Sequence, residues 1–391
     1  MAVFLSLVLW DDALAQNESD ERPLLEVEDG ISISRDSLFL LNLRFRMQNR
    51  FGMHSLAGND LSIHEIDARV RRLRLRFDGF VLNEKLLYYI QLSFSRADQD
   101  LDRGEIAHPI RDAVLYYNVN NDFYFGLGQA KLPGNRQRVV SSGNMQFAER
   151  SIVNAAMTLD RDFGLFAYFN RNSPFGWWHL KTALTTGEGR NAPPGNTGMA
   201  YTARVEYLPL GKFKNGGDYS EGDLECELKP KLSLAAGYSY NARATRTGGQ
   251  LGPDLYSERN ISTFIADMVF KFRGFALSSE YMQRSADDPI TLSSDSASLA
   301  YVYVGNGLNT QMSYFFSSGY EFAMRYSMLN PRVDLQGQER QMEELWLGVS
   351  KYLNGHRIKL QWHAAYRWRE SMQLSNPGNF WSCMMQVEFG I

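Results

Sequence analysis

The chain has 391 residues, enough for two or three soluble domains or for one large barrel. Its formal net charge is -3, from 41 basic and 44 acidic side chains, whereas a dedicated nucleic-acid-binding protein usually carries a basic excess. We therefore expect no nucleic-acid partner. The 24 Phe, 20 Tyr and 7 Trp residues are typical of a protein that buries rings or places them in interfacial belts.

The first fifteen residues have the pattern of a secretory signal, an apolar run VFLSLVLW followed by the small-residue pattern ALA. No stretch reaches the roughly eighteen apolar residues that a membrane-spanning helix needs. We therefore expect a signal peptide over 1–15, a periplasmic segment over 16–37 and a single exported domain over 38–391. An exported chain of this kind is periplasmic, secreted or an outer-membrane barrel.

One unit repeats along the chain: about ten residues of period-two hydrophobicity, followed by a break, as in transmembrane β-strands. In HRIKLQWHAAYRWR (356–369), Ile358 and Trp362 lie on one face, whereas Lys359 and Arg367 lie on the other. A β-sandwich also alternates, but its strands are mostly about five or six residues long. The pattern predicts an all-β, antiparallel transmembrane barrel of about sixteen strands, at 38–51, 67–79, 85–96, 112–119, 122–131, 162–170, 177–186, 199–208, 231–241, 260–272, 274–285, 298–316, 320–329, 341–352, 356–368 and 380–391.

The connections between these strands alternate in length, which gives the barrel a polarity. Those after strands two, four, ten, twelve and fourteen are short, reading FVLNE, NN, R, SSG and LNG. Those after several odd-numbered strands are long, at 52–66, 97–111, 132–161, 242–259 and 286–297. The short turns, on the side of both termini, are expected to be periplasmic. The long segment 209–230 is an exception, because it falls on the side of the turns.

Arginine alternates with apolar residues in RRLRLRF, and a charged side chain is strongly disfavoured against lipid. The arginines must therefore face a water-filled lumen. Closure of the barrel brings strands fifteen, sixteen, one and two together, so that one sector of the wall is basic. We call it the basic wall; its members are Arg44, Arg46, Arg50, Arg72, Arg74, Arg76, Lys359 and Arg367.

A basic wall in a confined pore selects anions. The alternative is a wall whose arginines are paired with Glu388, Asp78 and other lumenal carboxylates, and which is neutral overall. The acidic residues concentrate elsewhere, in ADQDLDRGE (97–105) and DYSEGDLECE (218–227). We therefore expect a basic interior with acidic ends.

The segment 132–161 is too long for a passive connection, and its apolar residues predict that it packs onto other parts of the molecule. As the third outer loop, folded into the lumen, it would constrict the pore. The alternative is a loop on the barrel rim or at a subunit contact. Guanidinium and hydroxyl groups suit an oxyanion such as phosphate. The candidate anion-binding residues at this constriction are Lys131, Arg136, Arg138 and Arg150, together with Ser141 and Ser142.

Several strings occur in an order that resembles the phosphate-selective porin O/P family of Gram-negative bacteria, and within it the Bacteroidetes-type members. They are LNLRFRMQNR, RRLRLRFDGFV, GLGQAKLP, FAERS, RDFGL, YLPLGKF, DYSEGDLECELKPKLSLAAGYSYN and MRYSML, and the likeness covers roughly 30–391. The resemblance implies an outer-membrane barrel of sixteen strands, commonly a homotrimer, with an inward third loop and an arginine-lined path for anions. It places Arg44, Arg46, Arg72, Arg74 and Arg76 on the basic strands, and Lys131 and Arg150 at the constriction.

Together these observations predict an anion-preferring channel for passive uptake of small solutes, phosphate among them. The alternatives are a non-selective or oligosaccharide-permeable porin and a structural barrel whose loops bind a partner. An outer-membrane lipase or protease lacks its motif: HEIDA (64–68) is not HExxH, and no GxSxG occurs. We expect no enzyme activity, no cofactor and no metal, because GLGQAK is not a dinucleotide loop and Cys226 and Cys383 match no metal spacing.

Overall fold

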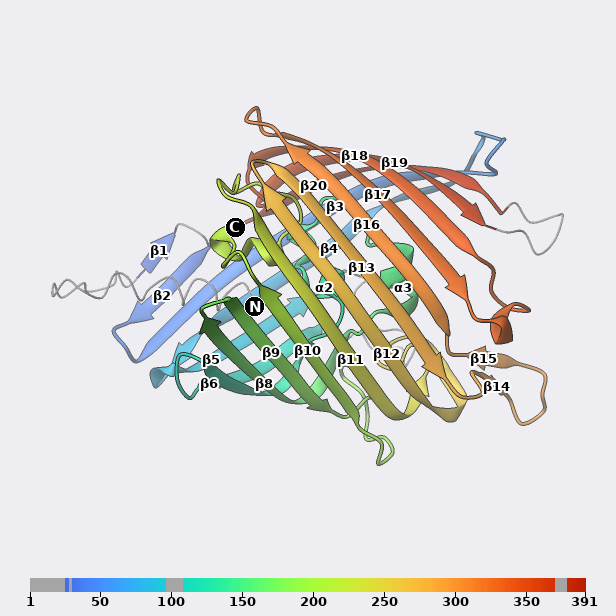
Figure 1. Ribbon diagram of the computed structural model, residues 1–391, viewed down its shortest axis with the longest axis horizontal. Coiled ribbons are helices and arrows are strands. Elements are labelled where there is room, and N and C mark those ends of the chain that lie inside the picture. The colour runs from blue at the N-terminus through green and yellow to red at the C-terminus, as the bar shows by residue number, and fades with distance from the viewer. Residues whose placement is uncertain (1–24, 28–29, 96–107, 370–377) are drawn as a thin grey trace.

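The computed structural model describes residues 25–27, 30–95, 108–369 and 378–391. The expected signal peptide and the acidic segment 97–105 lie outside these residues. The described residues form a closed barrel of sixteen antiparallel strands, which confirms the predicted fold class (Figure 1). Its strands are β3 (Phe39–Ser55), β4 (Ile63–Val81), β5 (Asn83–Ser93), β6 (Ile110–Asn118), β7 (Phe123–Lys131), β8 (Arg161–Ser173), β9 (Gly176–Thr185), β10 (Ala200–Leu208), β11 (Lys231–Arg246), β12 (Asp254–Phe272), β13 (Phe275–Ala286), β16 (Gly305–Phe315), β17 (Tyr320–Pro331), β18 (Met342–Asn354), β19 (Ile358–Arg369) and β20 (Phe380–Gly390).

The barrel closes between its first and last strands. β20 pairs with β3 from Ser382 opposite His54 to Gly390 opposite Arg46. Each remaining barrel strand pairs with the next one around the ring. The backbone hydrogen bonds of the wall are therefore satisfied between strands, as a lipid environment demands.

An N-terminal hairpin that the sequence did not predict lengthens this wall. It consists of β1 (Leu25–Val27) and β2 (Ile31–Arg35), and β2 pairs with β3 from Ile31 opposite Leu43. Two residues further along β3, Phe45 exchanges backbone hydrogen bonds with Ile391, the residue after β20. β2 therefore continues the line of β20 along the edge of β3, and Figure 1 shows the hairpin projecting beyond the barrel.

The prediction of one continuous strand over 298–316 is wrong. Residues Leu299–Tyr301 (β15) leave the barrel and pair with β14 (Ile290–Leu292) in a separate two-stranded sheet. The barrel strand starts at Gly305, whose φ of 147° favours glycine. A Cβ atom at Gly305 would lie 2.2 Å from the carbonyl oxygen of Asn330 on β17. The strand therefore breaks where the chain turns into the wall.

The two ends of the barrel differ in the length of their connections. One end, the turn end, carries the single residue Leu82 and the connections 119–122, 174–175, 273–274, 316–319 and 355–357. The other end, the loop end, carries the long connections, among them 132–160 and 186–199. The predicted polarity is therefore confirmed, and the long segment 209–230 lies at the turn end, as expected.

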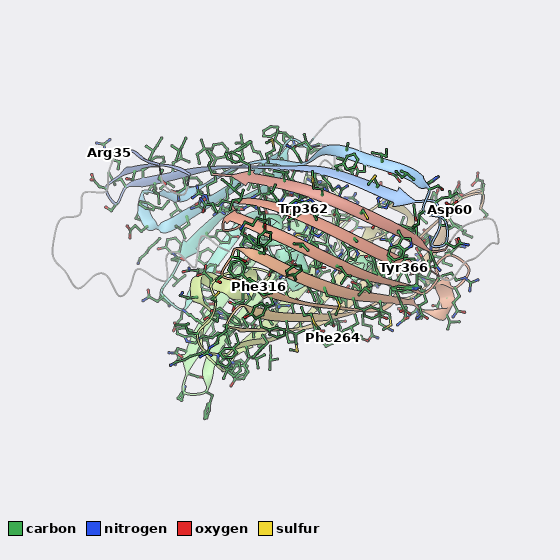
Figure 2. All side chains as sticks on the ribbon, turned by 90° about the horizontal axis from the view of Figure 1, so that it is seen from above. Arg35, Asp60, Phe264, Phe316, Trp362 and Tyr366 are labelled. Carbon is green, nitrogen blue, oxygen red and sulfur yellow. The ribbon has the colours of Figure 1, made fainter. Side chains whose placement is uncertain are left out.

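The outer face of the barrel is apolar and carries a belt of aromatic rings near each end. At the turn end, Trp178 stacks on Tyr207 with ring centroids 4.2 Å apart. At the loop end, Tyr366 meets Trp381 edge-on at 4.6 Å. In Figure 2, Tyr366 lies toward the loop-end residue Asp60, and Trp362 projects from the wall between the two ends. Aromatic belts that flank an apolar band mark the two interfaces of a bilayer.

The described helices are all short and lie in the connections. Within the described ranges, no helix is long and apolar enough to cross a bilayer. Three helical turns lie in 132–160. The elements are α2 (Arg136–Val139), η3 (Ser142–Asn144) and α3 (Ile152–Met157) in 132–160, η4 (Lys214–Tyr219) in 209–230, and η5 (Val333–Leu335).

Candidate functional site

The connection 132–160, which we call the lumenal loop, folds into the barrel as predicted. Its helix α3 begins at Ile152 and is capped by Ser151, whose hydroxyl accepts a hydrogen bond from the backbone N–H of Asn154. The helix buries Val153 and Met157 among inward-facing apolar side chains of β12, β13 and β17. Figure 1 shows α2 and α3 behind the front strands, inside the barrel. The alternative of a loop on the rim is therefore wrong.

The basic wall holds one side of the lumenal loop. Arg46 Nη1 donates to Ser141 Oγ at 2.8 Å, and Arg74 Nη1 donates to Ser142 Oγ at 2.9 Å. Lys359 Nζ donates to two backbone carbonyl oxygens of the loop. These basic side chains therefore position the loop, a role that the sequence did not predict for them.

Glu149 is the acidic centre of the same contact. Its carboxylate accepts hydrogen bonds from Arg50 on β3 and from Arg71 on β4. Burial alone would raise the pKa of Glu149, but the guanidinium groups of Arg71, Arg72 and Arg50 lower it well below the ordinary value of 4.5. Glu149 is therefore ionised at neutral pH and ties the loop to two strands.

Arg71 reaches the lumen because β4 carries a β-bulge. Val70 pairs with Asn49 and Arg72 pairs with Gln48, so that Arg71 is the extra residue between two partners on β3. Strict alternation would send Arg71 toward lipid when Arg72 faces the lumen. The bulge turns both arginines inward.

A ring contact anchors the loop to β17 and β18, the strands that adjoin the basic wall at β19. Phe147, almost fully buried, meets Trp346 on β18 edge-on with ring centroids 5.9 Å apart. The guanidinium carbon of Arg325 on β17 lies 4.7 Å from the centroid of each ring. Arg325 also donates to the carbonyl oxygen of Glu149 at 2.7 Å. This cluster fixes the turn between η3 and α3.

On the side of β12 and β13, the loop is held by ion pairs and by an arginine at the C-terminal end of α3. Arg136 Nε donates to Asp267 Oδ1 on β12 at 2.6 Å. Arg284 on β13 donates to the carbonyl oxygens of Met157 and Thr158, at the C-terminal end of α3. The lumenal loop therefore bridges the barrel from wall to wall.

A second segment enters the barrel from the turn end. We call residues 209–230 the turn-end insertion. Its Tyr219 hydroxyl accepts a hydrogen bond from Lys181 Nζ at 2.8 Å and donates to Glu206. Its Glu221 N–H donates to the carbonyl oxygen of Asn144 on the lumenal loop at 2.8 Å. The two segments therefore meet inside the barrel.

The turn-end insertion also corrects the expectation of a basic interior with acidic ends, because its acidic residues lie inside the molecule. Asp218, Asp223 and Glu227 are all buried. The Asp223 carboxylate accepts from the backbone N–H of Gly274 in the next turn at 2.7 Å. These carboxylates organise the insertion.

A cavity of about 390 Å³ remains between the two segments and the wall formed by β3 to β10. Among the described residues that line it, eight carry basic side chains and one, Asp112, carries an acidic one. The Arg44 side chain is 34% exposed and that of Arg46 is 30% exposed, so this cavity is open to solvent. The basic residues are Arg44, Arg46, Arg74, Arg76, Lys131, Lys181, Arg204 and Arg357.

Two fully buried carboxylates form ion pairs with arginines of this cavity. Asp78 lies 2.6 Å from Arg76 Nε and 3.9 Å from Arg44 Nη1. Glu388 lies 3.2 Å from Arg46 Nε and 3.4 Å from Lys359 Nζ. The alternative of a wall paired with Asp78 and Glu388 is thus correct for these contacts.

The twelve residues predicted from the sequence divide into three groups. Arg44, Arg46, Arg74, Arg76 and Lys131 line the cavity. Arg367 pairs with Glu344 Oε1 at 2.7 Å, outside the cavity lining. The others belong to the lumenal loop or hold it in place, Arg72 doing so through Gln48, whose amide donates to the carbonyl oxygen of Ser142: Arg50, Arg72, Arg136, Arg138, Arg150 and Lys359.

Within the lumenal loop, two of the predicted arginines contact the loop itself. Arg138 Nε donates to Asp160 at 2.7 Å, and Arg150 Nε donates to the carbonyl oxygen of Gln137 at 2.8 Å. Burial, together with the nearby charges of Arg138 and Arg74, lowers the pKa of Arg150 to about 9, so it is cationic at neutral pH. Arg150 therefore contributes charge close to Arg74 at the edge of the cavity.

Sequence reasoning missed three basic residues of the cavity, Lys181, Arg204 and Arg357. Lys181 and Arg204 face inward from predicted strands, and they pair in register across β9 and β10. The period-two pattern of those strands places both side chains on the lumenal face, although neither strand is rich in arginine.

The closed barrel, with its apolar outer face and charged lumen, is the architecture of a channel in the outer membrane of Gram-negative bacteria. Residues 41–389 match the family model described as phosphate-selective porin O and P, and the chain belongs to this family. It is therefore an outer-membrane porin, as the resemblance predicted. A comparison with curated proteins gives no significant match.

Solved porin structures share the fold. The anion-selective porin from Comamonas acidovorans has a TM-score of 0.59 at 12% identity, over 90% of this chain and 99% of that one. OmpF of Salmonella typhi, solved in complex with daunomycin, has a TM-score of 0.59 at 13% identity, over 92% and 100%. A trimer form of OmpT of Vibrio cholerae has a TM-score of 0.56 at 9% identity, over 90% and 99%. At these identities the likeness establishes the fold alone.

Proposed function

We propose that this porin conducts small anions in preference to cations, and that oxyanions such as phosphate are among its solutes. The observation that carries the proposal is the lining of the cavity, with eight basic side chains against the single acidic side chain of Asp112. A confined space with such a lining attracts anions and excludes cations. Guanidinium groups also bind oxyanions in a bidentate manner.

The lumenal loop would act as the constriction of this path. It crosses the barrel beside Arg74 and Lys131, so a solute that leaves the cavity toward the loop end passes these two side chains. We further propose that 1–15 is a signal peptide, that 16–37 lies in the periplasm, and that the protein forms a homotrimer. The family and the anion-selective and trimeric structures of similar fold support these assignments.

The test is the zero-current potential of the purified protein in a planar bilayer across a potassium chloride gradient. An anion-preferring channel gives a potential of the sign set by chloride. The variant Arg44→Gln/Arg76→Gln should move that potential toward zero, because both side chains line the cavity. The matched control is Arg243→Gln, whose side chain is half exposed at the loop end, paired with Glu258.

Equal permeability to potassium and chloride in the wild-type protein would contradict the proposal and favour a non-selective porin. The ion pairs of Asp78 and Glu388 are the observation that would then explain the result, because they neutralise part of the wall. Phosphate is tested in the same bilayer by its block of the chloride current. A block at concentrations well below that of chloride supports phosphate as a solute.

A further inference from the structure

The cavity described above has two unlike sectors: a basic sector lined by arginines, and a sector lined mainly by tyrosines, with Lys131, Lys181 and Arg204 on the same run of strands. Arg44, Arg46, Arg74 and Arg76 line it from β3 and β4, whereas tyrosines line it from the strands that follow. The rings of Tyr124 on β7 and Tyr168 on β8 are stacked, with centroids 4.5 Å apart and planes at 12°. Tyr116 on β6 meets both edge-on, at 6.1 and 6.2 Å. We call these three residues the tyrosine sector.

A glycine makes room for the tyrosine sector. Gly126 on β7 pairs in register with Tyr116 on β6. A Cβ atom at Gly126 would lie 2.5 Å from Cδ1 of the Tyr116 ring. The ring of Tyr116 therefore lies over the backbone of the neighbouring strand. Tyr116 stays half-buried, whereas Tyr124 and Tyr168 are buried.

Tyr89 on β5 joins the two sectors. Its ring lies 4.9 Å from the guanidinium carbon of Arg76. Leu132 and Val139 of the lumenal loop also line the cavity and add apolar surface to it. The cavity thus offers cationic groups and ring faces side by side, along a continuous arc of the wall from β3 to β8.

Inorganic phosphate or chloride would use only the basic sector. An aromatic face in a binding site gains free energy from contact with a flat ring, and a pocket of ~300 Å³ or more holds a ring-bearing molecule. The volume of about 390 Å³ meets this condition. We propose that this cavity binds anions that carry an aromatic ring, such as aryl phosphates, with the anionic group on Arg44, Arg46 or Arg76 and the ring against Tyr116. The inference rests on the proposed anion conduction and deepens it.

The test compares phenyl phosphate with methyl phosphate as blockers of the chloride current through single channels. The two probes carry the same anionic group, and only the first carries a ring. We expect phenyl phosphate to block at a concentration about tenfold lower than methyl phosphate, the difference that one good ring contact provides. Equal block by both probes would overturn the inference.

The failure of this inference is distinguishable from that of the proposed function. A wild-type channel that prefers chloride over potassium but does not separate the two probes retains anion conduction and loses the ring site. A channel without anion preference contradicts the proposed function, and therefore also the ring site, which rests on it.

Variants at Tyr116 locate the ring contact. Tyr116→Leu should bring the two blocking concentrations together, because the ring face is removed. Tyr116→Phe keeps the ring and should keep the preference, and its loss in that variant would overturn the inference in favour of a hydroxyl contact. The control Tyr238→Leu changes a tyrosine that faces outward and donates to Ser262, and it should retain the wild-type ratio. If Tyr116→Leu fails to fold, the Tyr116→Phe result and the wild-type ratio still decide.

Discussion

The ring of Phe147 in the lumenal loop meets the ring of Trp346 edge-on inside the barrel, with centroids 5.9 Å apart. A ring pair of this kind is expected in the core of a soluble domain rather than in a polar channel. It shows that the loop occupies the β17 to β19 side of the lumen as a packed core. The solvent-accessible cavity is therefore displaced toward β3 to β10.

The first prediction concerns this anchor. Phe147→Ala should destabilise the docked loop by about 3–5 kcal/mol, because the ring is almost fully buried and leaves a cavity. Single-channel recordings should show a larger and noisier current, since the loop leaves the lumen for part of the time. The control Phe175→Ala removes an exposed ring in a turn and should leave the current unchanged.

A second variant, on the barrel wall, tests the same contact of Phe147. A Cβ atom at Gly348 on β18 would lie 2.9 Å from Cε1 of Phe147. Gly348→Ala should therefore push the ring out of place and produce noise of the same kind. A quiet, unchanged current in both variants would mean that this contact does not hold the loop.

The second prediction concerns pH. The folded-state pKa of Glu149 lies below its ordinary value of 4.5, so its stabilising contribution is complete above that pH and is lost as the pH falls through the folded-state pKa. At about pH 4, where a free glutamate is largely protonated, Glu149 should remain ionised and the loop should stay docked. Current noise of the wild-type channel should be the same at about pH 4 as at neutral pH.

The matched variant for this prediction is Glu149→Gln, which cannot ionise. It leaves Arg50 and Arg71 without their shared carboxylate and should show increased noise at every pH. Glu65→Gln, an exposed position on β4, should behave as the wild type. Wild-type noise that rises to the level of Glu149→Gln at about pH 4 would refute the assigned pKa direction.

The third prediction concerns Asp78, whose carboxylate pairs with Arg76 of the cavity lining. Asp78 is fully buried and lies 2.6 Å from Arg76 Nε. Asp78→Asn keeps the shape of the side chain and removes its charge, so the cavity should become more positive. The zero-current potential in a potassium chloride gradient should shift further toward chloride. Asp122→Asn, at an exposed turn, is the control, and a shift toward potassium in Asp78→Asn would contradict the assigned path.

The fourth prediction concerns the turn-end insertion. Tyr219→Phe removes hydrogen bonds to Lys181 and Glu206 and should loosen the insertion by about 1–2 kcal/mol. Hydrogen exchange of the amides in 214–223 should become about tenfold faster. Tyr256→Phe, exposed on β12, should leave these rates unchanged. Unchanged exchange in Tyr219→Phe would show that other contacts hold the insertion.

The sequence predicted fifteen of the sixteen barrel strands, thirteen of them to within four residues at each end, because lipid on one face and water on the other impose period-two alternation. The same alternation placed Arg44, Arg46, Arg74 and Arg76 in the lumen, where the structure has them. At the bulge, the apolar positions shift phase from Val70 to Leu73, which is visible in the sequence. The sequence does not give the residues of the neighbouring strand between which the register changes, Gln48 and Asn49.

The sequence by itself determined which side chains avoid lipid, because that choice depends only on each residue and its position along a strand. Only the tertiary structure decided what those side chains do in the lumen. Arg74 lines the cavity and holds Ser142, whereas Lys359 is buried against Glu388 and the carbonyl oxygen of Met145. These partners lie on segments far apart in sequence, and they meet because the barrel closes and two connections fold into it.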